Sequence, residues 1–136
     1  MEKYNTVNLK GKEYVMVNDR ILAFKKLYPS WAIVTELVKL SDGMCVIKAT
    51  ILNEDGEEMA TGHAYEKEGS SFINKTSYIE NCETSAVGRA LGLLGIGIET
   101  SIASAEEVAN AIKQQKEDKP LPTADDFSKT LEGLKK

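Results

Sequence analysis

The chain has 136 residues, of which 42% are hydrophobic and 28% are charged, so its composition is that of a single globular domain. Its formal net charge of −4 does not indicate a protein that binds nucleic acid through an overall positive charge. No run of about 18 apolar residues occurs and the first residues lack an apolar core, so we expect neither a membrane span nor a signal peptide.

The charge is unevenly distributed along the chain. Residues 1–48 hold eight Lys/Arg and five Asp/Glu, a balance of +3, whereas residues 49–116 hold five and eleven, a balance of −6. A polyanion would therefore have to meet a local basic surface. The two cysteines, Cys45 and Cys82, sit in apolar patterns without metal-ligand spacing. We expect reduced, buried thiols, a cytoplasmic protein and no metal site.

The first third of the chain is predicted to contain one short helix. Residues 1–12 are polar and are predicted to be a lead-in, followed by a short extended piece at 14–17. The apolar spacing of residues 20–28 predicts a helix that begins after Asn18 or Asp19 as N-cap and stops at Pro29. Arg20 falls in its first turn, where a cation opposes the helix dipole, which favours a specific role for this side chain.

Three strands are predicted next, at residues 31–40, 44–53 and 58–66, because apolar and polar residues alternate there. Asp42-Gly43 and Asp55-Gly56 are hairpin signals, so the strands form an antiparallel meander. The third strand carries small residues on one face, including Gly62, which indicates that a helix lies close across it.

A long central helix is predicted from Ser77 as N-cap, with Glu80 completing a capping box. Glycines crowd its end at positions 88, 92, 95 and 97, and each interior glycine costs about 0.5–1 kcal/mol against alanine. Such a helix needs close approach of another backbone, a subunit or a ligand. Arg89 is a candidate anion contact on this helix, and the alternative is a surface arginine paired with Glu83 or Glu99.

The capping box Ser104 to Glu107 predicts a further helix to about residue 115. From residue 117 prolines and charges dominate, so we predict a domain at residues 1–116 and a flexible tail at 117–136 that could take a partner. The predicted fold class is α+β: a three-stranded antiparallel β-meander packed against a long central helix, with a preceding short helix and a C-terminal helix.

The sequence does not indicate an enzyme or a cofactor. His63 is the only histidine and has no nucleophile beside it in the sequence. No phosphate-binding G-x-x-x-x-G-K-[ST] motif occurs, and the glycine-rich run at 92–97 ends a helix where a phosphate loop would open one.

Two phrases resemble the single-strand annealing superfamily, which includes the eukaryotic Rad-fifty-two mediator and its phage relatives of the Sak, Erf and DdrA-like kinds. They are Y-I-E-N-C-E-T-S-A-V-G-R-A-L at 78–91, continuing to Gly95, and V-N-D-R-I-L-A-F at 17–24. The resemblance implies an ATP-independent protein that binds and anneals single-stranded DNA in recombination or repair, in a bacterial or phage-infected cell. It also implies a homo-oligomer, either a ring or a helical filament.

Carried over by position, the resemblance implies that Arg89 and Arg20 contact DNA in a groove. Gly88 and Gly92 stand where the eukaryotic pattern has basic residues, so Lys75 and Lys67 are candidate substitutes. Two alternatives stay open: a protein that only coats single-stranded DNA, and a small-ligand-binding or partner-binding α+β domain without DNA binding, which the acidic charge favours.

Overall fold

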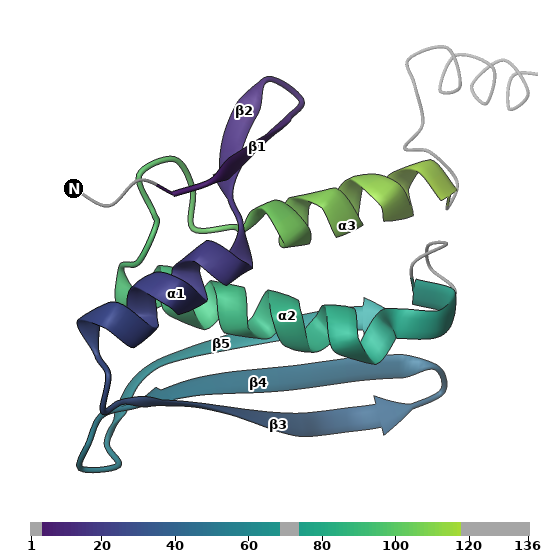
Figure 1. Cartoon of the computed structure of the whole chain (residues 1–136). Helices are drawn as coiled ribbons and strands as arrows, with labels where there is room; N and C mark the ends of the chain where they lie inside the picture. Colours follow the sequence, from purple (N-terminus) through teal and green to yellow (C-terminus); the bar gives the residue numbers. More distant parts are fainter. Residues whose placement is uncertain (1–3, 69–73, 118–136) are drawn as a thin grey trace, which may run out of the picture.

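Three strands form a sheet at the base of the molecule, and helices cover one of its faces (Figure 1). A computed structural model describes residues 4–68 and 74–117. The elements are β1 (Thr6–Leu9), β2 (Lys12–Val15), α1 (Val17–Leu27), β3 (Ala32–Ser41), β4 (Met44–Leu52), β5 (Glu58–Lys67), α2 (Asn74–Leu94) and α3 (Ala105–Glu117). The predicted α+β fold class is confirmed. Of the predicted tail, residues 118–136 lie outside the described residues.

The sheet has the strand order β3-β4-β5, and every pair is antiparallel. Its central strand, β4, alternates strictly between buried and partly exposed residues. The buried set is Cys45, Ile47, Ala49 and Ile51, as the period-2 pattern predicts. This face packs against α2, which contributes Cys82, Ala86, Ala90 and Leu91 to the same core. The other face of the sheet is open (Figure 1).

The backbones of β5 and α2 approach each other closely at Gly62. A Cβ atom built at this position would lie 2.4 Å from the Ala90 nitrogen and 2.7 Å from the Ala86 oxygen. Only glycine fits there, because both neighbours are backbone atoms of a helix that cannot retreat locally. The small residues on this strand therefore do mark a close helix, as the sequence predicts.

The strand β3 departs from the regular alternation that the sequence predicts. Its register against β4 shifts between Leu37 and Lys39, so Val38 is an extra residue in a β-bulge. Glu36 lies opposite Lys48, and Lys39 lies opposite Val46. Glu36 and Lys39 consequently share one face, although three positions separate them.

The predicted polar lead-in is wrong, because β1 and β2 form an antiparallel hairpin there. Lys10 and Gly11 both have positive φ, 52° and 85°, at its turn. Positive φ at both central residues is the geometry of a tight hairpin turn, which glycine favours. Of these two residues only Gly11 favours such a turn by its type, so the sequence signal for this hairpin is weak.

One predicted helix start is wrong, and the other coincides with a kink inside a longer helix. The helix α1 begins at Val17 after Met16, which makes no side-chain cap hydrogen bond. Its first amide is satisfied instead by α3, since the Val17 nitrogen donates to Glu106 Oε1 at 3.0 Å. The helix α2 begins at Asn74, and Ser77 has non-helical angles (φ −136°, ψ 25°) that mark a kink.

Both cysteines are free and buried, as predicted. The Cys82 thiol lies against the carbonyl oxygens of Ala64, at 3.3 Å, and Cys45, at 3.6 Å. Burial raises the pKa of Cys82 to about 12. These thiols are part of the core between the sheet and α2.

We predict that Gly62→Ala destabilises the fold, because the added methyl group meets helix backbone. Overpacking of this kind costs about 1–3 kcal/mol in the free energy of unfolding, measured by urea titration. The matched control is Thr61→Val, which changes the neighbouring, partly exposed position and should stay within about 0.5 kcal/mol. Equal stability of Gly62→Ala and the wild type would contradict the contact between β5 and α2.

Candidate functional site

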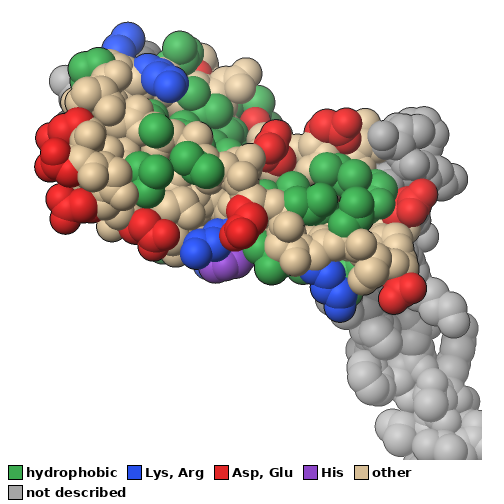
Figure 2. All heavy atoms as spheres, turned by 90° about the horizontal axis from the view of Figure 1, so that it is seen from below, with side chains coloured by type: hydrophobic (Ala, Val, Ile, Leu, Met, Phe, Trp, Pro, Cys, Tyr) green, Lys and Arg blue, Asp and Glu red, His purple; other side chains and the backbone are tan. Residues whose placement is uncertain are grey.

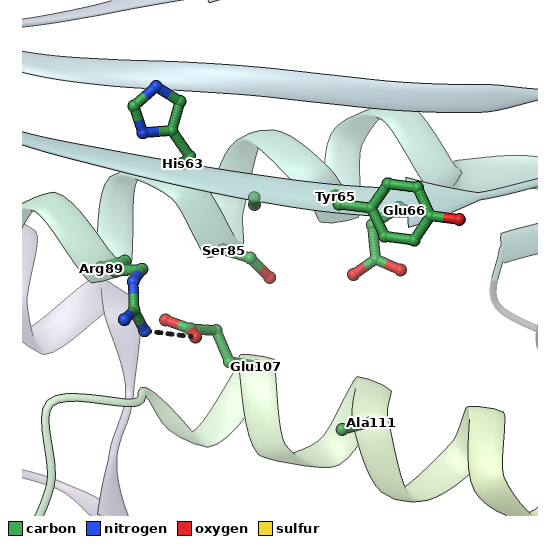
Figure 3. A pocket seen from close by; sticks show the side chains of 8 residues that line it. His63, Tyr65, Glu66, Ser85, Arg89, Glu107 and Ala111 are labelled. Atoms are coloured by element: carbon green, nitrogen blue, oxygen red, sulfur yellow. Dashed lines mark ion pairs between the residues drawn. The ribbon is translucent and has the colours of Figure 1, made fainter.

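A groove of about 270 Å³ runs along β5, between that strand, α2 and α3 (Figure 3). Its lining residues are His63, Ala64, Tyr65, Glu66, Ser85, Arg89, Glu107 and Ala111. Three separate elements therefore build it. Here a predicted site residue, Arg89, meets other polar side chains in a concave surface.

Arg89 forms an ion pair with Glu107 across the groove, with 3.7 Å between Nη1 and Oε2 (Figure 3). Its partner is neither of the two glutamates considered from the sequence, because α3 folds back along α2 and brings Glu107 to it. The side chains are 45% and 20% exposed, respectively. The guanidinium therefore stays accessible from solvent while its charge is partly compensated.

Glu107 is held in an unusual environment for a carboxylate. Its backbone nitrogen donates to Ser104 Oγ at 3.2 Å, which confirms Ser104 as the N-cap of α3. Its Oε1 atom is buried and has no hydrogen-bond partner. Burial raises the pKa of Glu107, while the nearby Arg89 acts in the opposite direction.

Ser85 adds a second buried polar atom to the groove. It is 4% exposed, and its Oγ has no hydrogen-bond partner. Ser85 lies one turn before Arg89 on α2, and its hydroxyl points into the space bordered by Arg89 and Glu107 (Figure 3). A buried hydroxyl without a partner is costly, so this position favours a polar ligand group or an ordered water. Together, the hydroxyl and the guanidinium can bind an anionic oxygen.

Arg20 does not lie at this groove. It is 0% exposed, and its guanidinium donates four hydrogen bonds to backbone carbonyls. Nη1 donates to Gly88 and Ile102, each at 2.8 Å, and Nη2 donates to Gly97 at 3.1 Å and Ser101 at 2.9 Å. Burial lowers the pKa of Arg20, and Glu107, Glu106 and Glu99 oppose that shift.

The predicted DNA contact by Arg20 does not fit this placement. A guanidinium whose terminal nitrogens bond four carbonyls of its own chain offers no donor to a phosphate at the surface. Arg20 lies in the first turn of α1, where a cation opposes the helix dipole, and its hydrogen bonds show that it has a structural role there. Arg20 joins α1 to the end of α2 and to the segment that follows it.

Of the two predicted lysines, Lys67 is not among the residues that line the groove. Lys67 is exposed at the end of β5, and it makes interactions within the protein. Lys75 lies in the first turn of α2, and its side chain is outside the described residues. Ser85 and Glu107 were missed as site residues. The capping box predicted that Glu107 starts a helix, but no local pattern shows which surface that helix meets.

Two further features bear on the chemistry of the site. Within residues 4–68 and 74–117, no helix is both long and apolar enough to cross a membrane. The same part of the chain contains no group of three or more histidine, cysteine, aspartate or glutamate side chains placed to hold a metal ion.

The family model described as "Slr1353 N-terminal dsRNA-binding domain-like" matches residues 21–94. These are 74 of the 136 residues, more than half of the chain, and they run from α1 through the sheet to the end of α2. No curated protein matches the sequence. The resemblance to the single-strand annealing superfamily is wrong, because the matched family is a different one. The order of a helix, a three-stranded meander and a second helix fits both families, so this order alone does not distinguish one family from the other.

We predict that Arg20→Ala strongly destabilises the protein. Removing the guanidinium leaves four carbonyls without their donor, and each buried unsatisfied group costs about 1–3 kcal/mol. A loss of at least ~3 kcal/mol in the free energy of unfolding should appear in urea titrations. Arg89→Ala is the matched control, because a partly exposed ion pair contributes only about 0–1 kcal/mol. Similar stability of the two variants would contradict the structural role of Arg20.

Proposed function

Because the chain belongs to the family described as "Slr1353 N-terminal dsRNA-binding domain-like", we propose that it binds nucleic acid, without ATP and without catalysing a reaction. The observation that carries this proposal is the family match over α1, the sheet and α2. Double-stranded RNA is the ligand that the family's description names. Proteins recognise RNA duplexes mainly by shape and by contacts to phosphates and 2′-hydroxyls, which requires no deep pocket.

The charge distribution supports contact with a phosphate backbone at restricted places. Lys25 and Lys26 are exposed in the last turn of α1. Arg89 lies in the groove beside the hydroxyl of Ser85. Phosphate contacts of this kind give affinity that is independent of sequence and falls with salt. An acidic protein can bind nucleic acid in this way if its few accessible cations meet phosphates.

Single-stranded DNA, with annealing of complementary strands, is the second candidate function. It is favoured by the open face of the sheet, where Tyr65 is 56% exposed and His63 is also exposed. Lys48 is the partner of His63 on β4. Exposed rings beside cations are how proteins stack unpaired bases, and a duplex keeps its bases stacked inside. In this function the protein would act in recombination or repair as a homo-oligomer, in a ring or a helical filament.

The ion pair with Glu107 would restrain binding at the groove in either case. A phosphate that contacts Arg89 must share it with a carboxylate at 3.7 Å. The net charge of −4 adds to this repulsion over longer distances. We therefore expect weak binding at physiological salt and measurable binding at low salt.

The first test compares binding of double-stranded RNA, single-stranded DNA and double-stranded DNA at low ionic strength. Arg89→Ala should weaken binding and reduce the salt slope by about 0.7 on single strands or about 0.9 on B-DNA for each lost contact. The matched control is Lys10→Ala, which removes a cation at the turn of the β1–β2 hairpin and should change binding little.

The ligand preference and an annealing assay separate the candidate functions. Preference for duplex RNA supports the first, and preference for single strands with faster pairing of complementary DNA supports the second. Absence of binding to all three ligands at low salt would reject both, and would leave a domain that binds a small ligand or a protein partner.

A second test uses the raised pKa of Glu107. As pH falls through that pKa, Glu107 becomes neutral and Arg89 loses its charged partner, so nucleic-acid binding should strengthen. Because the pKa of Glu107 is raised, this strengthening should begin at a higher pH than it would with a glutamate of ordinary pKa. Glu107→Gln should bind more tightly at pH 7, by about two- to fivefold for loss of an ion pair worth up to ~1 kcal/mol.

The same variant should lose part of the pH dependence. The difference between the two pH profiles therefore isolates Glu107. Identical profiles, together with identical affinity at pH 7, would contradict a restraining role for the ion pair.

A further inference from the structure

The strand β3 is an outer strand of the sheet and is exposed along almost its entire length. It carries four large apolar side chains that are 46–53% exposed: Val34, Leu37, Val38 and Leu40. An outer strand also presents unpaired backbone N–H and C=O groups along one side. Proteins usually protect such a strand with charge, a bulge or a partner. The strand β3 has ten residues and carries both charges and a bulge, but it still exposes these apolar side chains.

The open face of the sheet continues this apolar surface. Figure 2 shows hydrophobic side chains in two areas of that face, with charged side chains and the single histidine between them. The mixture of apolar and charged groups favours a protein partner with a defined register over a lipid surface or a nonspecific contact.

The bulge at Val38 gives β3 a charge pattern that is complementary to itself. It places Glu36 and Lys39 on the same face of the sheet, since their partners on β4 are Lys48 and Val46, two positions apart. Without the bulge the two charges would lie on opposite faces. One strand therefore shows, on one face, an anion followed by a cation.

We propose that β3 pairs antiparallel with β3 of a second copy of this chain around a two-fold axis, in the register that places Glu36 of each copy opposite Lys39 of the other. The two sheets would join into one of six strands. A two-fold contact uses the same surface on both copies, so a strand with one anion and one cation can satisfy itself twice. This pairing closes at two copies, so it is separate from the ring or filament of the second candidate function, and it does not depend on nucleic-acid binding.

The same register aligns the other side chains of β3 by type. It places Leu37 of each copy opposite Val38 of the other, beside the two-fold axis, so two half-exposed apolar side chains from each copy lie there. It also places Thr35 opposite Leu40 on the helix-covered side and Val34 opposite Ser41 on the open side. Cross-strand pairs of opposite charge and of apolar side chains are the ones that stabilise antiparallel sheets.

The other outer strand, β5, is less suited to this contact. The groove with Arg89 and Glu107 lies along β5, so a second copy paired there would cover it. Pairing through β3 leaves that groove open to a ligand. The assembly and the candidate site therefore use opposite edges of the same sheet.

The test measures the mass of the full chain by sedimentation velocity over micromolar concentrations. Wild-type protein should show a reversible dimer. Glu36→Lys and Lys39→Glu each turn two attractive pairs into repulsive ones, and each should raise the dimer dissociation constant about tenfold or more. The double variant Glu36→Lys/Lys39→Glu exchanges the charges and should recover the wild-type constant to within about threefold.

The matched control is Glu58→Lys, which makes the same charge change at an exposed position of β5 and should leave the dimer unchanged. All three substituted positions are exposed, so circular dichroism should show the same fold. A monomer at every concentration would overturn the proposal. A dimer or larger oligomer that is insensitive to Glu36→Lys, or that the double variant fails to restore, would overturn the β3 pairing while leaving self-association itself intact.

Discussion

The buried guanidinium of Arg20 is the interaction on which the arrangement of the helices depends. It bonds the carbonyl of Gly88 inside α2 and three carbonyls of the segment after it, at Gly97, Ser101 and Ile102. One side chain of α1 thus fixes where the chain goes once α2 ends. Five donors in a planar fork suit this task, and a lysine ammonium could not reach four acceptors in this geometry.

The position of α3 follows from that fixed segment, and α3 then supplies two carboxylates to distant elements. Glu106 accepts the Val17 amide and so caps α1, while Glu107 pairs with Arg89. The glycines of α2 make room for this arrangement. A Cβ at Gly92 would lie 2.8 Å from Arg20 Nη1, and one at Gly88 would lie 2.6 Å from Val17 Cγ2. The close approach that the glycines indicate is therefore to side chains of α1 in the same chain.

The sequence predicts what depends on local periodicity and misses what depends on distant contacts. Alternation in β4 correctly identifies its buried face, and Gly62 correctly indicates a close helix, because each is a property of consecutive residues. The burial of Arg20 could not be predicted, since its acceptors lie 68 to 82 positions away. The partner of Arg89 was missed for the same reason, and the bulge at Val38 interrupts a pattern that reads as regular alternation.

In the proposed dimer, the two grooves lie at opposite edges of the joined sheet. Their separation sets the length of nucleic acid that could contact both. Six paired strands span five spacings of about 4.8 Å, so the two β5 strands, and the grooves along them, would lie roughly 24 Å apart. A B-form DNA duplex rises about 3.4 Å per base pair, so about seven base pairs of it cover that distance. Only a longer ligand could contact Arg89 of both copies, and the second contact would then be intramolecular, with a high effective concentration. Weak binding at each acidic groove and useful affinity for long nucleic acid are therefore compatible in one small protein.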